Sequence, residues 1–225
     1  MIFGKIDYLN LLPFHVFLKR YPMSSAERKA IEHKKGVPSK LCRDLNSARV
    51  GAAVISSVES RRAKYRKLDF GICARERVIS VLVRKGTPRQ LDPASMSSNM
   101  LSKILGLEGE VVIGDNALRA YLKDGREAFY DLGEEWKKRT GLPFVFGRFS
   151  CVRGAKYFGR LVSKFHRAPV KIPRYILSEY SRSRGVSESD ILWYLQFISY
   201  KMGAKEKLAL SIFLSRARAL RFDPN

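Results

Sequence analysis

The sequence is poor in the residues that build metal centres and disulfide frameworks. Only three cysteines and three histidines occur among its 225 residues, and none of them shows the short spacing of a zinc site. The cysteines, Cys42, Cys73 and Cys151, lie far apart and are odd in number, which is typical of reduced thiols. We therefore expect neither a metal site nor a disulfide.

Long apolar runs are also missing. No segment reaches the roughly 18 consecutive apolar residues that a transmembrane helix needs. The first residues do not show the basic, then apolar, then small-residue order of a secretory signal. We therefore expect a cytoplasmic protein without membrane attachment, and the 45% of hydrophobic residues is enough for a large buried core.

Acidic residues are scarce relative to basic ones. The chain has 21 Asp and Glu against 43 Lys and Arg, which gives a formal net charge of +22 at pH 7. Such a charge attracts anions, and nucleic acid is the first partner to consider. The basic residues, however, are spread along the whole chain and accompany no known nucleic-acid-binding motif. We expect no specific nucleic-acid partner, and a basic surface of this kind would steer a small dianion.

The common catalytic signatures are absent as well. The chain has no G-x-G-x-x-G, no P-loop, no H-E-x-x-H and no G-x-S-x-G. These absences argue against dinucleotide-dependent enzymes, P-loop nucleotide hydrolases, zinc peptidases and serine hydrolases of the usual types.

The order of apolar patterns instead predicts alternating strands and helices, followed by a helical last third. Predicted strands lie at 50–55, 78–83, 111–115 and 144–146, and predicted helices start at 38, span 96–105 and 116–122, and later cover 157–165, 191–200 and 205–220. This order predicts two α/β lobes with a ligand cleft between them. Residues 1–82 and 148–225 would form the first lobe, and residues 83–147 the second.

Small polar residues recur at the expected strand-to-helix junctions. Each of them is also explained by helix capping, but several that meet at one cleft favour binding. Helix N-termini carry free N–H groups and a positive dipole end, which suits carboxylates. We predict Asn10 as a catalytic residue that orients the ligand and stabilises charge. The predicted substrate-binding residues are Ser39, Ser56, Ser57, Ser97, Ser98, Asn99 and Asp115. Which of positions 97 to 99 contacts the substrate stays open.

Six blocks of the sequence together resemble the chorismate dehydratase family of the futalosine route to menaquinone. They come in the family's order and cover most of residues 1–150: "IDYLNLLPF" (6–14), "GVPSKL" (36–41), "AAVISSVES" (52–60), "ISVLVRKGTP" (79–88), "VVIGDNAL" (111–118) and "YDLGEEWKKRTGLPFVF" (130–146). Two features depart from the family pattern: Cys42 replaces an expected polar Asn, and "SMSSNM" (95–100) replaces a Ser/Thr-rich helix start.

The resemblance implies a type II periplasmic-binding-protein-like fold used as a cytoplasmic enzyme. It also implies the dehydration of chorismate to 3-[(1-carboxyvinyl)oxy]benzoate, a reaction that needs no metal or organic cofactor. Chorismate carries two carboxylates, which agrees with the polar residues predicted at the cleft. A substrate carboxylate could act as the base, which would explain why no protein base stands out.

Two other functions remain open at this point. The same fold would serve a non-catalytic small-carboxylate-binding protein equally well. The related dihydroxynaphthoate synthase shares the fold, but its Ser-Pro-Cys-Pro-Asn-like opening and Thr-Thr loop are not found here. The sequence indicates no particular oligomeric state.

Overall fold

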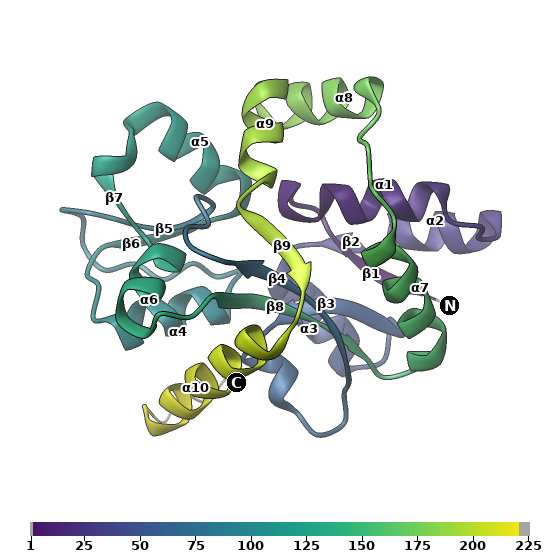
Figure 1. The fold of residues 1–225 in the computed structure, drawn as a ribbon, viewed down its shortest axis with the longest axis horizontal. Coiled ribbons are helices and arrows are strands. Elements are labelled where there is room, and N and C mark those ends of the chain that lie inside the picture. Colours follow the sequence, from purple (N-terminus) through teal and green to yellow (C-terminus); the bar gives the residue numbers. More distant parts are fainter. Residues whose placement is uncertain (1, 221–225) are drawn as a thin grey trace.

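Two β-sheets organise the chain, as the computed structural model shows for residues 2–220 (Figure 1). The larger sheet has the strand order β2-β1-β3-β8-β4-β9, and the smaller one the order β6-β5-β7. The strands are β1 Phe3–Ile6, β2 Lys35–Gly36, β3 Ala52–Ser56, β4 Arg66–Ala74, β5 Val81–Arg84, β6 Glu110–Ile113, β7 Phe129–Asp131, β8 Phe144–Cys151 and β9 Ile198–Lys201.

Helices follow most strands and cover the sheets. They are α1 Leu12–Arg20, α2 Ser25–His33, α3 Pro38–Asn46, α4 Met96–Leu105, α5 Gly114–Asp124, α6 Leu132–Thr140, α7 Ala155–Arg167, α8 Arg174–Arg184, α9 Glu188–Leu195 and α10 Ala204–Ala219, with short 3-10 turns η1 Leu9–Leu11, η2 Glu59–Arg61 and η3 Arg126–Ala128. None of the helices in this part of the chain is long and apolar enough to cross a membrane.

The first strands of the larger sheet bring two predicted site segments to one edge. Strands β1 and β3 pair in parallel, with Phe3 opposite Ala52. Because parallel strands end at the same edge of a sheet, Asn10 and Ser56 come out on the same side. A cluster of buried rings behind them, among which Phe14 and Phe70 have centroids 4.8 Å apart, fixes the helix that follows β1. Truncating such a buried ring typically costs about 3–5 kcal/mol, so these rings contribute strongly to the stability of this part of the fold.

The smaller sheet is inserted between two long strands of the larger one. The segment 144–146, expected from sequence to lie in the second lobe, is the beginning of β8, which pairs with β3 and β4 in the larger sheet. Helix α10 packs on both lobes, since Phe213 contacts Trp136 of α6 at 6.2 Å and Phe144 of β8 at 4.8 Å between ring centroids. The division into residues 1–82 with 148–225 and 83–147 stays a prediction about folding units.

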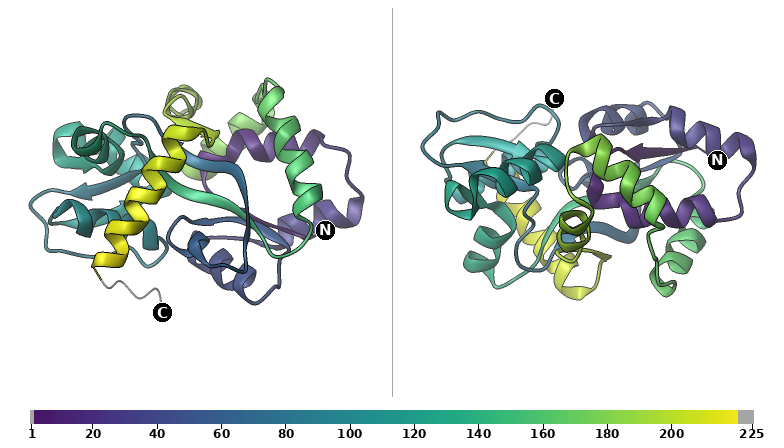
Figure 2. Two further views of the ribbon diagram at one scale, coloured as in Figure 1. Left: turned by 60° about the horizontal axis from the view of Figure 1, so that its bottom comes forward. Right: turned by 90° about the horizontal axis from the view of Figure 1, so that it is seen from above.

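One predicted helix is wrong in its second half. The sequence pattern extended a helix from Ile191 to Tyr200, whereas α9 ends at Leu195 and β9 begins at Ile198. The reason is pairing with a distant strand: Ile198 lies opposite Ala74 of β4, which outweighs the local helical pattern. This strand also delivers Tyr200 to the segment that carries Asn10. In Figure 2, the view from above shows α8 and α9 over the junction of the two lobes.

Candidate active site

A narrow cleft between the two sheets collects most of the polar groups predicted from sequence. Its volume is about 40 Å³, whereas pockets for small molecules usually measure roughly 300–1,000 Å³. The lobes therefore lie nearly closed on each other. The lining residues come from both lobes: Ile6, Tyr8, Asn10, Pro38, Ile55, Ser56, Ile72, Ser80, Val81, Ser95, Ser98, Ile113, Gly114, Phe146 and Gly147.

Three helices begin at this cleft. Pro38 starts α3, Ser95 precedes α4, and Gly114 starts α5. Gly114 has φ +63°, and a Cβ at this position would lie 3.0 Å from the Tyr8 ring, so glycine is required there. Among residues 2–220, no Asp, Glu, His, Lys or Arg lines the cleft. The arrangement thus offers hydroxyls and helix N-termini to an anion.

A cluster of three serines joins the lobes behind one wall of the cleft. The Oγ of Ser97 lies 2.7 Å from the Oγ of Ser56 and 2.9 Å from the Oγ of Ser57. It also accepts a hydrogen bond of 3.3 Å from the backbone N–H of Val58. Ser56 lines the cleft, whereas Ser57 and Ser97 are completely buried behind it. Two of the predicted residues therefore lie one layer away from a ligand.

The start of α4 differs in detail from the expectation. The sequence predicted Ser97 or Ser98 as the helix cap, and this is wrong. The cap is Ser95, whose side chain accepts a hydrogen bond from the backbone N–H of Ser98 at 3.3 Å. The hydroxyls of Ser95 and Ser98 are 2.7 Å apart, and both line the cleft. Sequence reasoning missed Ser95, although a serine directly before a helical segment is a common N-cap.

Asn10 lies on η1 with its side chain at the cleft. Its backbone carbonyl accepts a hydrogen bond of 2.7 Å from the Tyr200 hydroxyl. Its Oδ1 is buried and has no hydrogen-bond partner within residues 2–220. Buried polar atoms are usually paired, so an unpaired amide oxygen in a cleft indicates a place for a ligand. The backbone carbonyl of Asn10 thus stabilises the turn, and the side chain of Asn10 can contact a ligand in the cleft.

A strained backbone positions Ser80, a second lining residue that sequence reasoning missed. Ile79 has φ +64°, an uncommon conformation for a β-branched residue. Asp131 holds this turn, because its carboxylate accepts from the N–H groups of Val78 at 3.0 Å and Ile79 at 2.7 Å. Ser80 in turn accepts from the Tyr194 hydroxyl at 2.8 Å. No local signal could have found Ser80, because the pattern at 78–83 reads as one continuous strand.

Tyr8 adds a phenol to the cleft. Burial raises the pKa of Tyr8 to about 12, and the nearby carboxylates of Asp92 and Asp115 act in the same direction. The phenol therefore stays protonated at neutral pH and serves as a hydrogen-bond donor. It lies in the same opening block as Asn10 but was not among the predicted site residues.

Ser39 and Asn99, like Ser57 and Ser97, lie outside the cleft lining. Ser39 was expected to cap α3, but Val37 occupies the cap position and Pro38 is the first residue of the helix. Its backbone N–H donates to the Ala94 carbonyl at 3.1 Å. The Asn99 side chain accepts from the Asp92 N–H at 3.0 Å and donates to the Asp92 carbonyl at 2.7 Å. The Ser39 backbone and the Asn99 side chain thus each form a link to the segment 92–94 that precedes α4.

Asp115 also lies beside the cleft, in a bridge between the lobes. Its Oδ1 accepts from the Leu9 N–H at 2.9 Å, and its Oδ2 lies 3.5 Å from Nε of Arg184. Arg184 also pairs with Asp7 at 2.9 Å. Burial raises the pKa of Asp115, while the Leu9 N–H and Arg184 oppose that shift. One arginine therefore fastens both lobes through two carboxylates.

The part of the chain that the structure describes has no group of three His, Cys, Asp or Glu placed to hold a metal ion. The groups at the cleft are hydroxyls, one amide, one phenol and backbone N–H groups. These can bind carboxylates, orient a substrate and stabilise developing negative charge, but none is a general base of ordinary strength.

Comparison with known families identifies a match along nearly the whole chain. A family model described as menaquinone biosynthesis matches residues 1–106 and 90–219. A chorismate dehydratase from Campylobacter jejuni is 50% identical over 221 residues, covering 98% of this chain and 99% of that protein. A chorismate dehydratase from Thermus thermophilus is 27% identical, covering 99% of this chain and 97% of that protein.

Comparison with solved structures confirms the predicted fold class. A protein from Archaeoglobus fulgidus is similar with a TM-score of 0.71 and 16% identity, covering 97% of each chain. The periplasmic aliphatic sulphonate binding protein of Escherichia coli has a TM-score of 0.58 and 13% identity, covering 100% of this chain and 88% of that one. The two-lobed architecture is therefore periplasmic-binding-protein-like.

Proposed function

Because this chain belongs to the menaquinone biosynthesis family, we propose that it removes water from chorismate to give 3-[(1-carboxyvinyl)oxy]benzoate, the first step of the futalosine route. The observation that carries the proposal is the near full-length identity of one residue in two to the Campylobacter jejuni chorismate dehydratase. It is therefore a carbon–oxygen lyase acting on a small dicarboxylate.

The reaction is an elimination that makes an aromatic ring. The ring carbon that bears the hydroxyl loses it, and the neighbouring carbon that bears the ether oxygen loses its hydrogen, so that hydroxide and a proton leave together as water. Aromatisation supplies a large driving force, and for this reason we propose that no cofactor takes part. The protein's task is to hold the diene in a geometry for elimination and to stabilise developing charge.

The groups at the cleft suit this task. We propose that Ser56 and Ser98, with Ser95 and the helix N-termini, bind the two substrate carboxylates. Asn10 would donate its amide N–H to the leaving hydroxyl or to a carboxylate, and Tyr8 would donate from its phenol. Each charged hydrogen bond of this kind is worth about 1.5–3 kcal/mol.

The remaining predicted residues have supporting positions. We propose that Ser57 and Ser97 hold Ser56 in place through the serine cluster. Contacts of the substrate with Ser39, Asn99 and Asp115 remain a prediction, because these residues lie outside the cleft lining and would reach a ligand only when the lobes move.

The cleft as it stands holds too little volume for chorismate, so substrate entry requires the lobes to open. Since no carboxylate or imidazole of the described residues lines the cleft, we propose that a carboxylate of chorismate itself accepts the proton. We also propose that the enzyme acts in the cytoplasm, where its substrate would reach it without transport, and that its positive charge speeds capture of the dianion.

The direct test is incubation of the purified protein with chorismate. The absorbance of the cyclohexadiene should fall, and mass spectrometry should find a product lighter by one water that retains the enolpyruvyl ether. Binding of chorismate by calorimetry without loss of the diene would refute the enzymatic proposal and favour a carboxylate-binding protein. A boiled sample controls for spontaneous breakdown of chorismate.

A further inference from the structure

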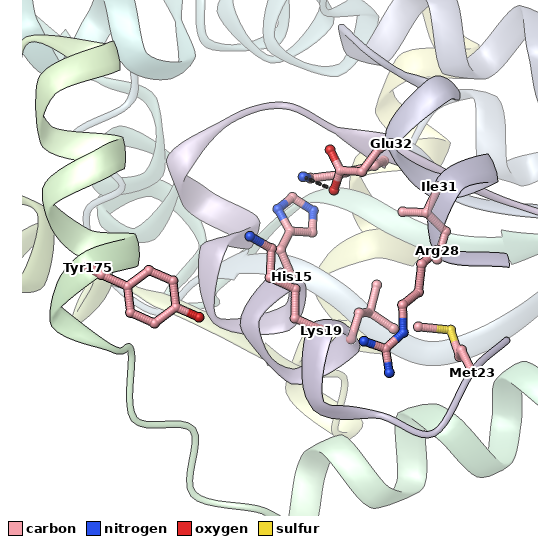
Figure 3. Close-up of a pocket in the computed structure, with 9 residues that line it drawn as sticks. His15, Lys19, Met23, Arg28, Ile31, Glu32 and Tyr175 are labelled. Carbon is pink, nitrogen blue, oxygen red and sulfur yellow. Dashed lines mark hydrogen bonds and ion pairs between the residues drawn. The ribbon is translucent and has the colours of Figure 1, made fainter. Parts of the chain in front are cut away.

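A second cavity lies on the outer side of the larger lobe (Figure 3). It has a volume of about 390 Å³, which falls within the range of small-molecule pockets. Strand β1, helices α1 and α2 and the first turn of α8 form its walls, and none of its lining residues belongs to the cleft between the lobes. Its contents are therefore independent of the proposed dehydration.

The charges around this outer cavity are unbalanced. Three cationic side chains, those of Lys5, Lys19 and Arg28, line it together with a single carboxylate, that of Glu32. Lys5 is buried, and its Nζ lies 2.9 Å from Oε1 of Glu32, whose own side chain is 53% exposed. A buried ammonium group is costly without an anionic partner. Here that partner is a half-exposed surface carboxylate, which an incoming carboxylate could replace.

His15 supplies a second, independent sign of a ligand. Its side chain is only 4% exposed, and neither ring nitrogen has a hydrogen-bond partner within residues 2–220. Burial lowers the pKa of His15 well below its ordinary value, and the positive charges of Lys5 and Lys19 add to the shift. The ring is therefore neutral and offers one N–H donor and one acceptor. In the view of Figure 3, its ring lies between the Glu32 and Lys19 side chains.

The rest of the cavity is apolar. Leu18, Met23 and Ile31 form part of its wall, and Tyr175 is 70% exposed at its edge. In Figure 3 the Tyr175 ring reaches from α8 toward the cavity. A large aromatic side chain this exposed, next to aliphatic side chains and cations, suits a ligand with an apolar body and one anionic end.

We propose that the outer cavity binds a small organic monocarboxylate with an apolar body. The carboxylate of this ligand replaces that of Glu32 next to the Lys5 ammonium group and accepts a hydrogen bond from the His15 N–H. It also faces the ammonium group of Lys19. The apolar body lies on Leu18, Met23 and Ile31 under the Tyr175 ring. A carboxylate is preferred to other anions because Lys5 already holds one in this structure.

The test is a titration of the full chain, labelled with nitrogen-15 in its histidines, with hexanoate as the probe. We expect a saturable shift of the His15 ring signals, which the His15→Phe variant identifies by their loss, and no shift of the His166 signals. Acetate lacks the apolar body and hexanol lacks the charge, so each should bind at least about tenfold more weakly, as expected for loss of a charged hydrogen bond or of several buried methylene groups.

Two charge-matched variants locate the binding. Lys19→Glu should weaken hexanoate binding about tenfold or more, whereas Lys29→Glu, an exposed position of α2 that does not line the cavity, should leave it within about twofold. Ser98→Ala, which alters the cleft, should also have no effect. The proposal is overturned if hexanoate gives no saturable His15 shift, if hexanol binds equally well, or if Lys19→Glu binds like wild type.

Discussion

The most informative single change is Asn10→Asp, with Asn10→Ala as its companion. The backbone carbonyl of Asn10 is held by Tyr200, whereas its side-chain oxygen is buried without a partner among the described residues. Either substitution therefore leaves the turn intact and changes only what the side chain presents to the cleft. The aspartate keeps the shape, removes the N–H donor and adds a negative charge.

The expected magnitude follows from the charges around the cleft. In the part of the chain that the structure describes, no Lys or Arg lines it, so an aspartate there would face the substrate dianion without a counter-charge. Two negative charges about 4 Å apart repel by about 4 kcal/mol at an effective dielectric constant near 20, and about 1.4 kcal/mol is a factor of ten. Loss of one preorganised donor alone typically lowers kcat by about 10²–10³. We expect kcat/KM to fall at least about a hundredfold for Asn10→Ala, and further for Asn10→Asp.

The assay is the loss of diene absorbance at saturating and at low chorismate, combined with a thermal melt of each variant. Because the side chain makes no hydrogen bond in the described structure, the Tm should change by no more than about 2–4 °C, which corresponds to about 1 kcal/mol in a chain of this size. Lowering the pH should partly restore Asn10→Asp, since a protonated carboxyl can donate, and should not restore Asn10→Ala.

Near-normal turnover of either variant would refute the catalytic role. A large drop in Tm with turnover preserved per folded molecule would show that Asn10 only stabilises the turn. Equal losses in the two variants at every pH would contradict the electrostatic part of the reasoning and leave only the lost donor.

Four further changes test other parts of the structure. Ser98→Ala should raise KM for chorismate about tenfold with little change in kcat, since it removes binding shared by ground and transition states. Arg184→Met should lower the Tm by several degrees in a melting experiment, at about 2–4 °C for each kcal/mol, because it leaves two carboxylates of the inter-lobe bridge without their cation. Raising the ionic strength should lower kcat/KM while leaving kcat nearly constant, and an unchanged kcat/KM would argue against steering by the surface charge. The folded state keeps the pKa of His15 below its unfolded value, so at low pH the unfolded chain binds one more proton than the folded chain. The unfolding free energy should therefore fall as pH drops below about 6.5, by up to about 1.4 kcal/mol per pH unit. Denaturant titrations of His15→Phe should lack this pH dependence, and those of His33→Gln should retain it.

Local sequence patterns determined several helices and the class of fold. The helix predicted at Met96–Leu105 is α4 with the same bounds, and the apolar stripe at 157–165 lies within α7. Ser187 caps α9 by accepting from the backbone N–H of Asp190 at 3.0 Å. These features depend on residues a few positions apart, whose burial and capping are encoded in the local order of apolar and polar side chains.

Asn10, Ser56 and Ser98 could be predicted as cleft residues because each stands next to the end of a strand or the start of a helix. The family resemblance likewise rested on contiguous blocks, and it led to the reaction that the comparisons support. Ser57 and Ser97 were predicted from the same reasoning. Which serine of the pairs 56–57 and 97–98 faces the cleft depends on how the two lobes pack against each other. Neither segment by itself specifies that packing.

The tertiary structure alone decided the remaining features. Ser80 faces the cleft because Asp131, 52 residues away from Ile79, holds a positive-φ turn. Leu9 and Asp115 are 106 residues apart in sequence yet form one hydrogen bond between the lobes. His15 lies in the outer cavity, without a hydrogen-bond partner among the described residues, because α1, α2 and α8 pack around it. Local patterns specify which side chains are buried, but the partner of a buried polar group is set by long-range packing, which no short stretch of this sequence records.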